Sequence, residues 1–217
     1  MNAVVWLIDF ILHIDRHLQG VIARCGSWTY GVLFAIVFCE TGLVITPLLP
    51  GDSLLFAAGA FAASGALEVG PLFATIAVAA ILGDTVNYRI GQALGPKVFQ
   101  RPDSRILKKE YLGRTQRFFA RYGGKTIVLA RFVPIVRTFA PFLAGVGAMS
   151  YGRFLLYNVA GGLLWTAVGV GCGWGFGNLP FVKKNFSLVV VAIVVVSLVP
   201  IALEWWNQRR RPGPPAP

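Results

Sequence analysis

The chain has 217 residues, of which 56% are hydrophobic and 13% are charged, and its mean hydropathy is +0.66. Soluble proteins carry about 25% charged residues, so this composition excludes a soluble globular domain and indicates a protein embedded in a membrane. The 20 Lys and Arg residues outnumber the 9 Asp and Glu residues, and the net charge of +11 suits an anionic lipid surface rather than nucleic acid.

Residues 1–27 are predicted to form an interfacial amphipathic helix that precedes the membrane core. Asp15 and Arg16 supply its polar side. His13 and His17 lie one helical turn apart, but a metal site needs a third ligand of the usual kind, which this segment lacks. We therefore expect no metal there, and nothing else in the sequence indicates a cofactor.

The apolar stretch 28–67 is too long to be one membrane-spanning helix. A straight helix of this length would be about twice as long as the bilayer is thick. Helix-breaking residues interrupt the stretch near its middle, namely Pro47, Pro50 and Gly51. We therefore predict a re-entrant hairpin over about 28–67, with Glu40 and Asp52 as its charged residues.

A helix and a basic loop follow the first hairpin. The helix is predicted over 71–88, and its last turn carries a secondary polar site formed by Asp84, Asn87 and Tyr88. The loop over 89–125 contains ten Lys and Arg residues against two acidic residues. Cytoplasmic loops carry such an excess of positive charge, so we expect this loop to face the cytoplasm.

The stretch 126–150 repeats the pattern of the first hairpin. It is apolar and long enough to span a bilayer, yet it carries Arg131 and Arg137 and is interrupted by Pro134 and Pro141. Two broken apolar segments, one in each half of a chain, are typical of transporters built from inverted repeats. We therefore predict a second re-entrant hairpin, opposed to the first in a pseudo-inverted repeat.

Two uninterrupted membrane helices complete the predicted fold, over 154–176 and 186–206. Gly169, Gly173 and Gly177, at four-residue spacing at the end of the first, make a flat face for close helix packing. The second ends in tryptophans and leads into an Arg- and Pro-rich tail over 207–217, which we expect in the cytoplasm. The predicted fold class is an all-α polytopic integral membrane protein with a single membrane domain over 28–206.

Four charged residues lie in the two broken segments, where a charge at bilayer depth costs about 2.5–3.5 kcal/mol. Glu40 and Asp52 contribute −2 and Arg131 and Arg137 contribute +2, so their formal sum is zero. We expect the two hairpins to meet near mid-membrane and the four charges to share one wet cavity. A buried ion-pair cluster that only fixes the packing is the alternative.

Arginine suits phosphate binding better than it suits mere neutralisation, because its planar fork can hold two oxygens. The nearby chain breaks also leave backbone N–H and C=O groups available to a ligand. Glu40 or Asp52 could take and release a proton as Arg131 or Arg137 changes partner. Proton coupling at the two carboxylates and phosphate binding at the two arginines form the leading hypothesis.

Three motifs resemble those of the DedA family of bacterial inner-membrane proteins, in the superfamily of VTT-domain proteins. The first lies at 38–55 (FCETGL and PLLPGDSLL), the second at 83–91 (GD, NY and G), and the third at 123–145 (GGK, ARFVP, RTFAP and AG). The resemblance extends from about Ile8 to Trp205, and motifs of this length and spacing are highly specific.

The resemblance implies two opposed re-entrant hairpins and lipid translocation driven by the proton motive force. It also implies that the substrate is undecaprenyl phosphate or another lipid phosphate. The acidic pair of the family corresponds to Glu40 and Asp52, and its arginine pair to Arg131 and Arg137. We therefore expect an inner-membrane protein whose partners are membrane lipids and protons, with no nucleic acid.

Three other classes of function are alternatives to this hypothesis. A proton-coupled antiporter of a small ion or drug would use the same carboxylates but would have little need of two arginines. A non-transporting membrane scaffold or chaperone is compatible with the packing glycines. An enzyme is least favoured, because both histidines precede the membrane core and the sequence has no G-x-S-x-G motif or metal cluster.

Overall fold

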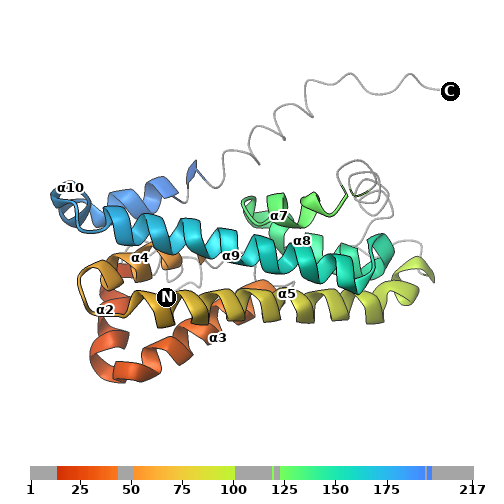
Figure 1. The fold of residues 1–217 in the computed structure, drawn as a ribbon, viewed down its shortest axis with the longest axis horizontal. Coiled ribbons are helices and arrows are strands. Elements are labelled where there is room, and N and C mark those ends of the chain that lie inside the picture. The colour runs from red at the N-terminus through yellow and green to blue at the C-terminus, as the bar shows by residue number, and fades with distance from the viewer. Residues whose placement is uncertain (1–13, 44–50, 101–118, 120–122, 194, 197–217) are drawn as a thin grey trace, which may run out of the picture.

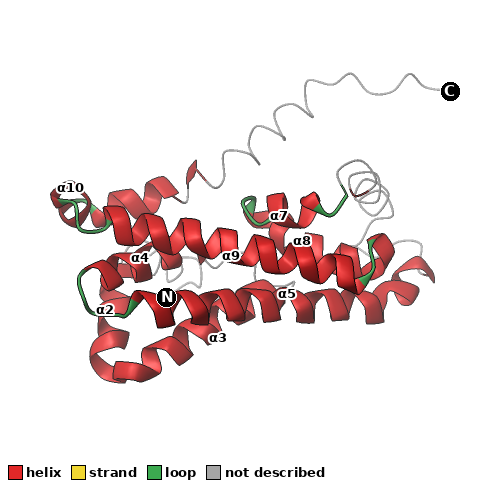
Figure 2. Cartoon of the chain, viewed as in Figure 1, coloured by secondary structure: helices red, strands yellow, loops and turns green. Residues whose placement is uncertain are grey.

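The computed structural model describes residues 14–43, 51–100, 119, 123–193 and 195–196, and all regular structure in these residues is helical (Figure 2). The elements are α2 (Ile14–Cys25), the 3₁₀-helix η1 (Gly26–Trp28), α3 (Thr29–Gly42), α4 (Gly51–Ala63), α5 (Val69–Gln100), α7 (Lys125–Ala130), α8 (Pro134–Leu143), the π-helix η2 (Ala144–Ala148), α9 (Tyr151–Phe176) and α10 (Pro180–Lys184). A further helical stretch covers 186–193.

Three helical stretches among the described residues are long and apolar enough to cross a membrane: Arg16–Gly42, Val69–Gly95 and Tyr151–Phe176. The last two belong to α5 and α9, which run antiparallel beside each other through the centre of the fold (Figure 1). The predicted fold class, an all-α membrane protein that crosses the bilayer several times, is confirmed.

Each broken segment has two helical arms, one on either side of its chain break. The two arms of a segment pack on different long helices. In the first half α3 packs along α5 and α4 packs along α9. In the second half the arms are exchanged, because α7 packs on α9 whereas α8 and η2 pack on α5. This exchange joins the two halves into one body and agrees with two related repeats. The re-entrant path of both segments through a bilayer stays a prediction.

Helix α5 is longer than the predicted helix over 71–88, since it continues to Gln100 and includes the first residues of the predicted basic loop. Small residues allow this extension. A Cβ atom at Gly91 would collide with the carbonyl oxygen of Phe142 in α8, and a Cβ atom at Gly95 would be in ordinary van der Waals contact with Val146 in η2. Packing against α8 and η2 thus stabilises a stretch that its own charge and proline content would not favour as a membrane helix.

The residues predicted to break the two hairpins differ in their place in the structure. Pro47 and Pro50 lie outside the described residues, whereas Gly51 begins α4. In the second half the chain turns at 131–133, and Pro134 starts α8. Pro141 does not break the segment as predicted, because α8 continues through it to Leu143. The wider π-helix η2 then follows directly, which relaxes the winding after a residue that cannot donate a backbone hydrogen bond.

The glycine face predicted at the end of the helix over 154–176 is present at the end of α9. Gly169, Gly173 and Gly177 lie against Leu55, Phe56 and Ala60 of α4. At the N-terminal side, Ile14 and Leu18 of α2 are buried in the main hydrophobic core while Arg16 and His17 are exposed. Helix α2 is therefore amphipathic with its apolar face on the protein. The rest of the predicted helix, residues 1–13, lies outside the described residues.

Candidate functional site

The first ion-pair group joins Arg137 to both predicted carboxylates of the first half. Arg137 near the start of α8 donates from Nη2 to Glu40 Oε1 at the end of α3. Its Nη1 donates to Asp52 Oδ1 in the first turn of α4, at 3.2 Å. The backbone N–H of Gly51 donates to the same Glu40 Oε1, at 3.1 Å. One guanidinium thus ties together the two helix ends that flank the first chain break.

Trp165 of α9 completes this group. Its Nε1 donates to Asp52 Oδ1 at 2.8 Å, and its ring covers the guanidinium of Arg137 at 4.9 Å from the ring centroid. The Asp52 side chain is 26% exposed, whereas those of Glu40 and Arg137 are almost fully buried. Asp52 is therefore the member of the group that is most open to the surroundings of the protein.

The second ion-pair group is centred on Arg131, in the turn between α7 and α8. Its Nη2 donates to Asp84 Oδ2 of α5 and to Asn158 Oδ1 of α9, each at 2.5 Å. Asn158 is held in turn by donating from Nδ2 to the carbonyl oxygen of Ile81, at 3.0 Å. All three side chains of this group are buried, so the second chain break is anchored to both long helices.

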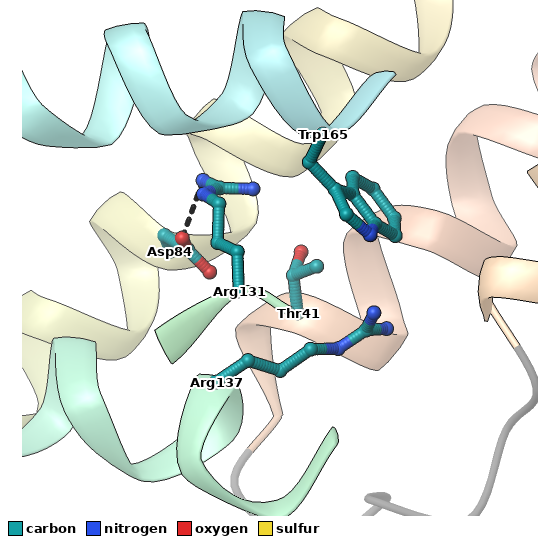
Figure 3. A pocket seen from close by; sticks show the side chains of 5 residues that line it. All are labelled: Thr41, Asp84, Arg131, Arg137 and Trp165. Atoms are coloured by element: carbon teal, nitrogen blue, oxygen red, sulfur yellow. Dashed lines mark hydrogen bonds and ion pairs between the residues drawn. The ribbon is translucent and has the colours of Figure 1, made fainter. Parts of the chain in front are cut away.

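A small cavity lies between the two ion-pair groups. Figure 3 shows its lining side chains, which come from α3, α5, α9 and both sides of the second break: Thr41, Asp84, Arg131, Arg137 and Trp165. The volume open to the centre of a water molecule is about 10 Å³, roughly the space that one water needs. The two arginines thus face one cavity, but a phosphate group fits between them only after the surrounding helices move.

The four predicted charges do come together, but in two groups and with a fifth member. Asp84, which we predicted in a secondary polar site, pairs with Arg131 instead. Three carboxylates and two guanidiniums in this cluster of described residues give a formal sum of −1 when all are ionised, because Asp84 adds one negative charge to the four predicted residues, whose own sum is zero. The ion pair with Arg131 holds the Asp84 carboxylate inside the bundle.

Asn87 and Tyr88, the other residues of the predicted secondary site, hold helix ends in place. Asn87 Nδ2 donates to the carbonyl oxygens of Thr41 and Thr138, at 3.2 and 2.8 Å. Tyr88 donates from its hydroxyl to the carbonyl oxygen of Met149 at 3.0 Å, and its ring stacks on Phe154. In the structure the three residues therefore point to separate partners and do not gather into one polar site.

Replacing Asn87 by Ala is expected to lower stability without changing the charge of the site. The change removes the side-chain donor from two buried carbonyl oxygens, those of Thr41 at the end of α3 and Thr138 within α8, and each such loss costs about 1–3 kcal/mol. We expect a lower midpoint of thermal unfolding in detergent, followed by tryptophan fluorescence. Gln92→Ala in the exposed part of the same helix is the control and should leave the midpoint unchanged. Equal midpoints for both variants would show that Asn87 does not hold the breaks.

Two residues of the ion-pair groups were not predicted from sequence, Asn158 and Trp165. Each carried a weak signal. Asn158 is the one amide in the apolar run 154–176, and Trp165 lies in the middle of that run rather than at a membrane interface, where tryptophan is usual. A polar group in the middle of a membrane helix is a functional candidate by default, and this rule would have selected Asn158.

Comparison with known proteins identifies the family. Residues 49–175 match the family model of the VTT domain. Over 212 residues, 97% of each chain, the sequence is 52% identical to Protein DedA of Escherichia coli (strain K12). The chain belongs to the DedA family. It is also 48% identical to Uncharacterized membrane protein Rv0364 of Mycobacterium tuberculosis (strain ATCC 25618 / H37Rv), covering 81% of this chain and 78% of that protein.

A third relative has a location in its name. Inner membrane protein YghB of Escherichia coli (strain K12) is 34% identical over 93% of this chain and 87% of its own length. No solved structure matches the chain. Family membership and the three apolar helical stretches make this chain a multi-pass inner-membrane protein. The names of these DedA-family relatives describe membrane proteins and specify no reaction.

Proposed function

We propose that this DedA-family protein moves a lipid phosphate, such as undecaprenyl phosphate or a phospholipid, across the inner membrane with the proton motive force as its drive. The observation that carries the proposal is the pair of buried arginines, Arg131 and Arg137, that face one cavity at the second chain break (Figure 3). A guanidinium group can bind two oxygens of one phosphate at once, and it keeps its charge at any working pH.

In this proposal, protons act on the carboxylates that form ion pairs with the arginines in the structure. Glu40 and Asp52 both accept from Arg137, and a proton on either one weakens its hold on the guanidinium. Asp52 is the more exposed of the two, so it lies on the side of the group that water can reach. Release of Arg137 then loosens α8 from the ends of α3 and α4 and opens the space that a head group needs.

The orientation in the membrane is part of the same proposal. The basic residues of 89–125 and the Arg-rich tail 207–217 face the cytoplasm, and the two broken segments enter the bilayer as opposed re-entrant hairpins. Within α5, the guanidinium of Arg89 lies 4.5 Å from the ring centroid of Tyr151. Arginine on the cytoplasmic side and tyrosine at either membrane interface are typical of membrane proteins, so this contact agrees with the proposed placement.

Liposomes test the proposed transport. Purified protein is reconstituted with undecaprenyl phosphate, a pH gradient is imposed, and the lipid exposed in each leaflet is measured over time. The wild type should redistribute the lipid, and Arg131→Ala and Glu40→Ala should each slow it at least about tenfold, since a hydrogen bond to a charged group contributes about 1.5–3 kcal/mol.

Arg153→Ala is the matched control for this assay, because Arg153 lies exposed on α9 outside the ion-pair groups. It should transport lipid as fast as the wild type. Wild-type rates for Arg131→Ala and Glu40→Ala would refute the proposed mechanism.

A proton-coupled antiporter of a small cation is the second candidate. Two observations favour it: the carboxylates outnumber the guanidiniums in the described cluster, and the cavity has the size of a water molecule. The same liposomes distinguish the two functions. A proton flux that depends on an added cation and proceeds without any lipid movement would favour the antiporter.

A further inference from the structure

Within the part of the chain that the structure describes, Asp84 differs from Glu40 and Asp52 because it does not share its arginine with another carboxylate. If that arginine turned to another anion, Asp84 would be left without a cation. Arg137 holds two carboxylates, and one of them, Asp52, is 26% exposed and can be solvated. Asp84 is the one carboxylate that pairs with Arg131 among the described residues, and its side chain is only 6% exposed. If Arg131 turns to another anion, the Asp84 carboxylate is left buried and unpaired, which is the costly arrangement for a charge.

Among the residues that the structure describes, the surroundings of Asp84 offer no cation besides Arg131 that is not already paired with other carboxylates. Facing its carboxylate are Arg131 from the turn before α8 and Arg137 from α8, and Arg137 is already shared by Glu40 of α3 and Asp52 of α4. From α9 come only uncharged groups, the amide of Asn158 and the ring of Trp165. Arg131 itself is not fully satisfied, because its Nε has no hydrogen-bond partner among the described residues.

We propose that Asp84 is an internal anion that a phosphate head group displaces from Arg131, and that the displaced carboxylate takes up one proton. This inference rests on the proposed function. The proton comes from water and forms an O–H bond on Asp84, while Arg131 donates to a phosphate oxygen in place of Oδ2. When the phosphate leaves, the proton returns to water and the ion pair of Arg131 with Asp84 forms again.

The charge balance gives the direction of coupling. The five ionised side chains of the site sum to −1, and a singly charged phosphate would bring the sum to −2 in a buried setting. One proton on Asp84 restores −1 while Glu40 and Asp52 stay ionised, so the proton on Asp84 offsets the charge of the phosphate. Lipid phosphate and protons therefore move in the same direction across the membrane.

Binding of a soluble probe measures this coupling directly. The full chain in an uncharged detergent is titrated with decyl phosphate by calorimetry, in two buffers of different ionisation enthalpy and at several pH values. The wild type should take up about one more proton per bound probe than Asp84→Asn. Its affinity should therefore fall with rising pH about tenfold per unit more steeply than that of Asp84→Asn. Comparing the two proteins cancels the proton carried by the probe itself.

Asn158→Ala is the matched control, because it also removes a partner of Arg131 but no charge. It should change the affinity and keep the wild-type number of protons. Equal proton numbers for the wild type and Asp84→Asn would overturn the role of Asp84 and leave the proposed function standing. Absence of any binding by the wild type would contradict the proposed function itself.

A second probe keeps the inference testable if Asp84→Asn does not fold. Dihexanoylphosphatidylglycerol carries one phosphate charge that does not titrate near neutral pH, so any proton taken up on binding goes to the protein. Uptake of about two protons by the wild type is the expected result, one on Asp84 and one on the carboxylate that releases Arg137. Uptake of only one proton, no uptake, or a release of protons would overturn the inference.

Discussion

Arg137→Ala should abolish lipid phosphate transport and lower the free energy of unfolding by about 3–5 kcal/mol, the usual cost of removing one partner from a buried ion pair. The change leaves Glu40 buried without a cation and frees Asp52 from α8. It also removes the guanidinium that lies over Trp165. Unfolding in detergent and the liposome assay measure the two effects separately.

Two further variants separate charge from geometry at this position. Arg137→Ala combined with Glu40→Gln should regain part of the lost stability, because no buried carboxylate is then left unpaired, yet it should stay inactive in transport. Arg137→Lys keeps the charge but loses the planar fork, so it should be more stable than Arg137→Ala and still transport poorly. An Arg137→Ala protein with wild-type stability would show that the ion-pair group does not hold the chain break.

Gly173→Ala should lower the free energy of unfolding by about 1–3 kcal/mol through overpacking at the contact of α4 with α9. A Cβ atom at Gly173 would collide with the carbonyl oxygen of Phe56, and backbone cannot move aside as a flexible side chain can. Helix α4 must shift, which moves Asp52 at its start away from the indole N–H of Trp165. We therefore expect slower lipid transport together with a lower unfolding midpoint.

Gly171→Ala is the matched control, since it places the same methyl group in the same helix two residues away. A Cβ atom at Gly171 meets no other atom within 4 Å. This variant should keep wild-type stability and transport, because alanine is a better helix former than glycine. Equal effects at both positions would mean that the close approach of α4 and α9 does not determine the geometry of the site.

Sequence alone was sufficient for the features that depend on local composition. The uncharged run 154–176 lies within α9, and its glycine face packs on α4 as expected. The gathering of Glu40, Asp52, Arg131 and Arg137 was also predictable, because charges in an apolar segment must find partners inside the protein.

The pairing within the site could not be predicted, because it depends on how α5 and α9 lie against the two breaks. Asp84 was placed at a helix end beside a basic loop, and only the extended α5 shows it facing Arg131. Asn158 and Trp165 point into the site as a result of helix rotation, which the apolar run 154–176 does not specify. The continuity of α8 through Pro141 likewise depends on packing against α5.

The most direct test of the central claim is a structure of the full chain in a lipid nanodisc that contains undecaprenyl phosphate. We predict a phosphate group within hydrogen-bond distance of both Arg131 and Arg137, with the contact between Arg131 and Asp84 broken and the cavity enlarged. A lipid phosphate bound elsewhere, with the pairs of Arg131 with Asp84 and of Arg137 with Glu40 both intact, would contradict the account.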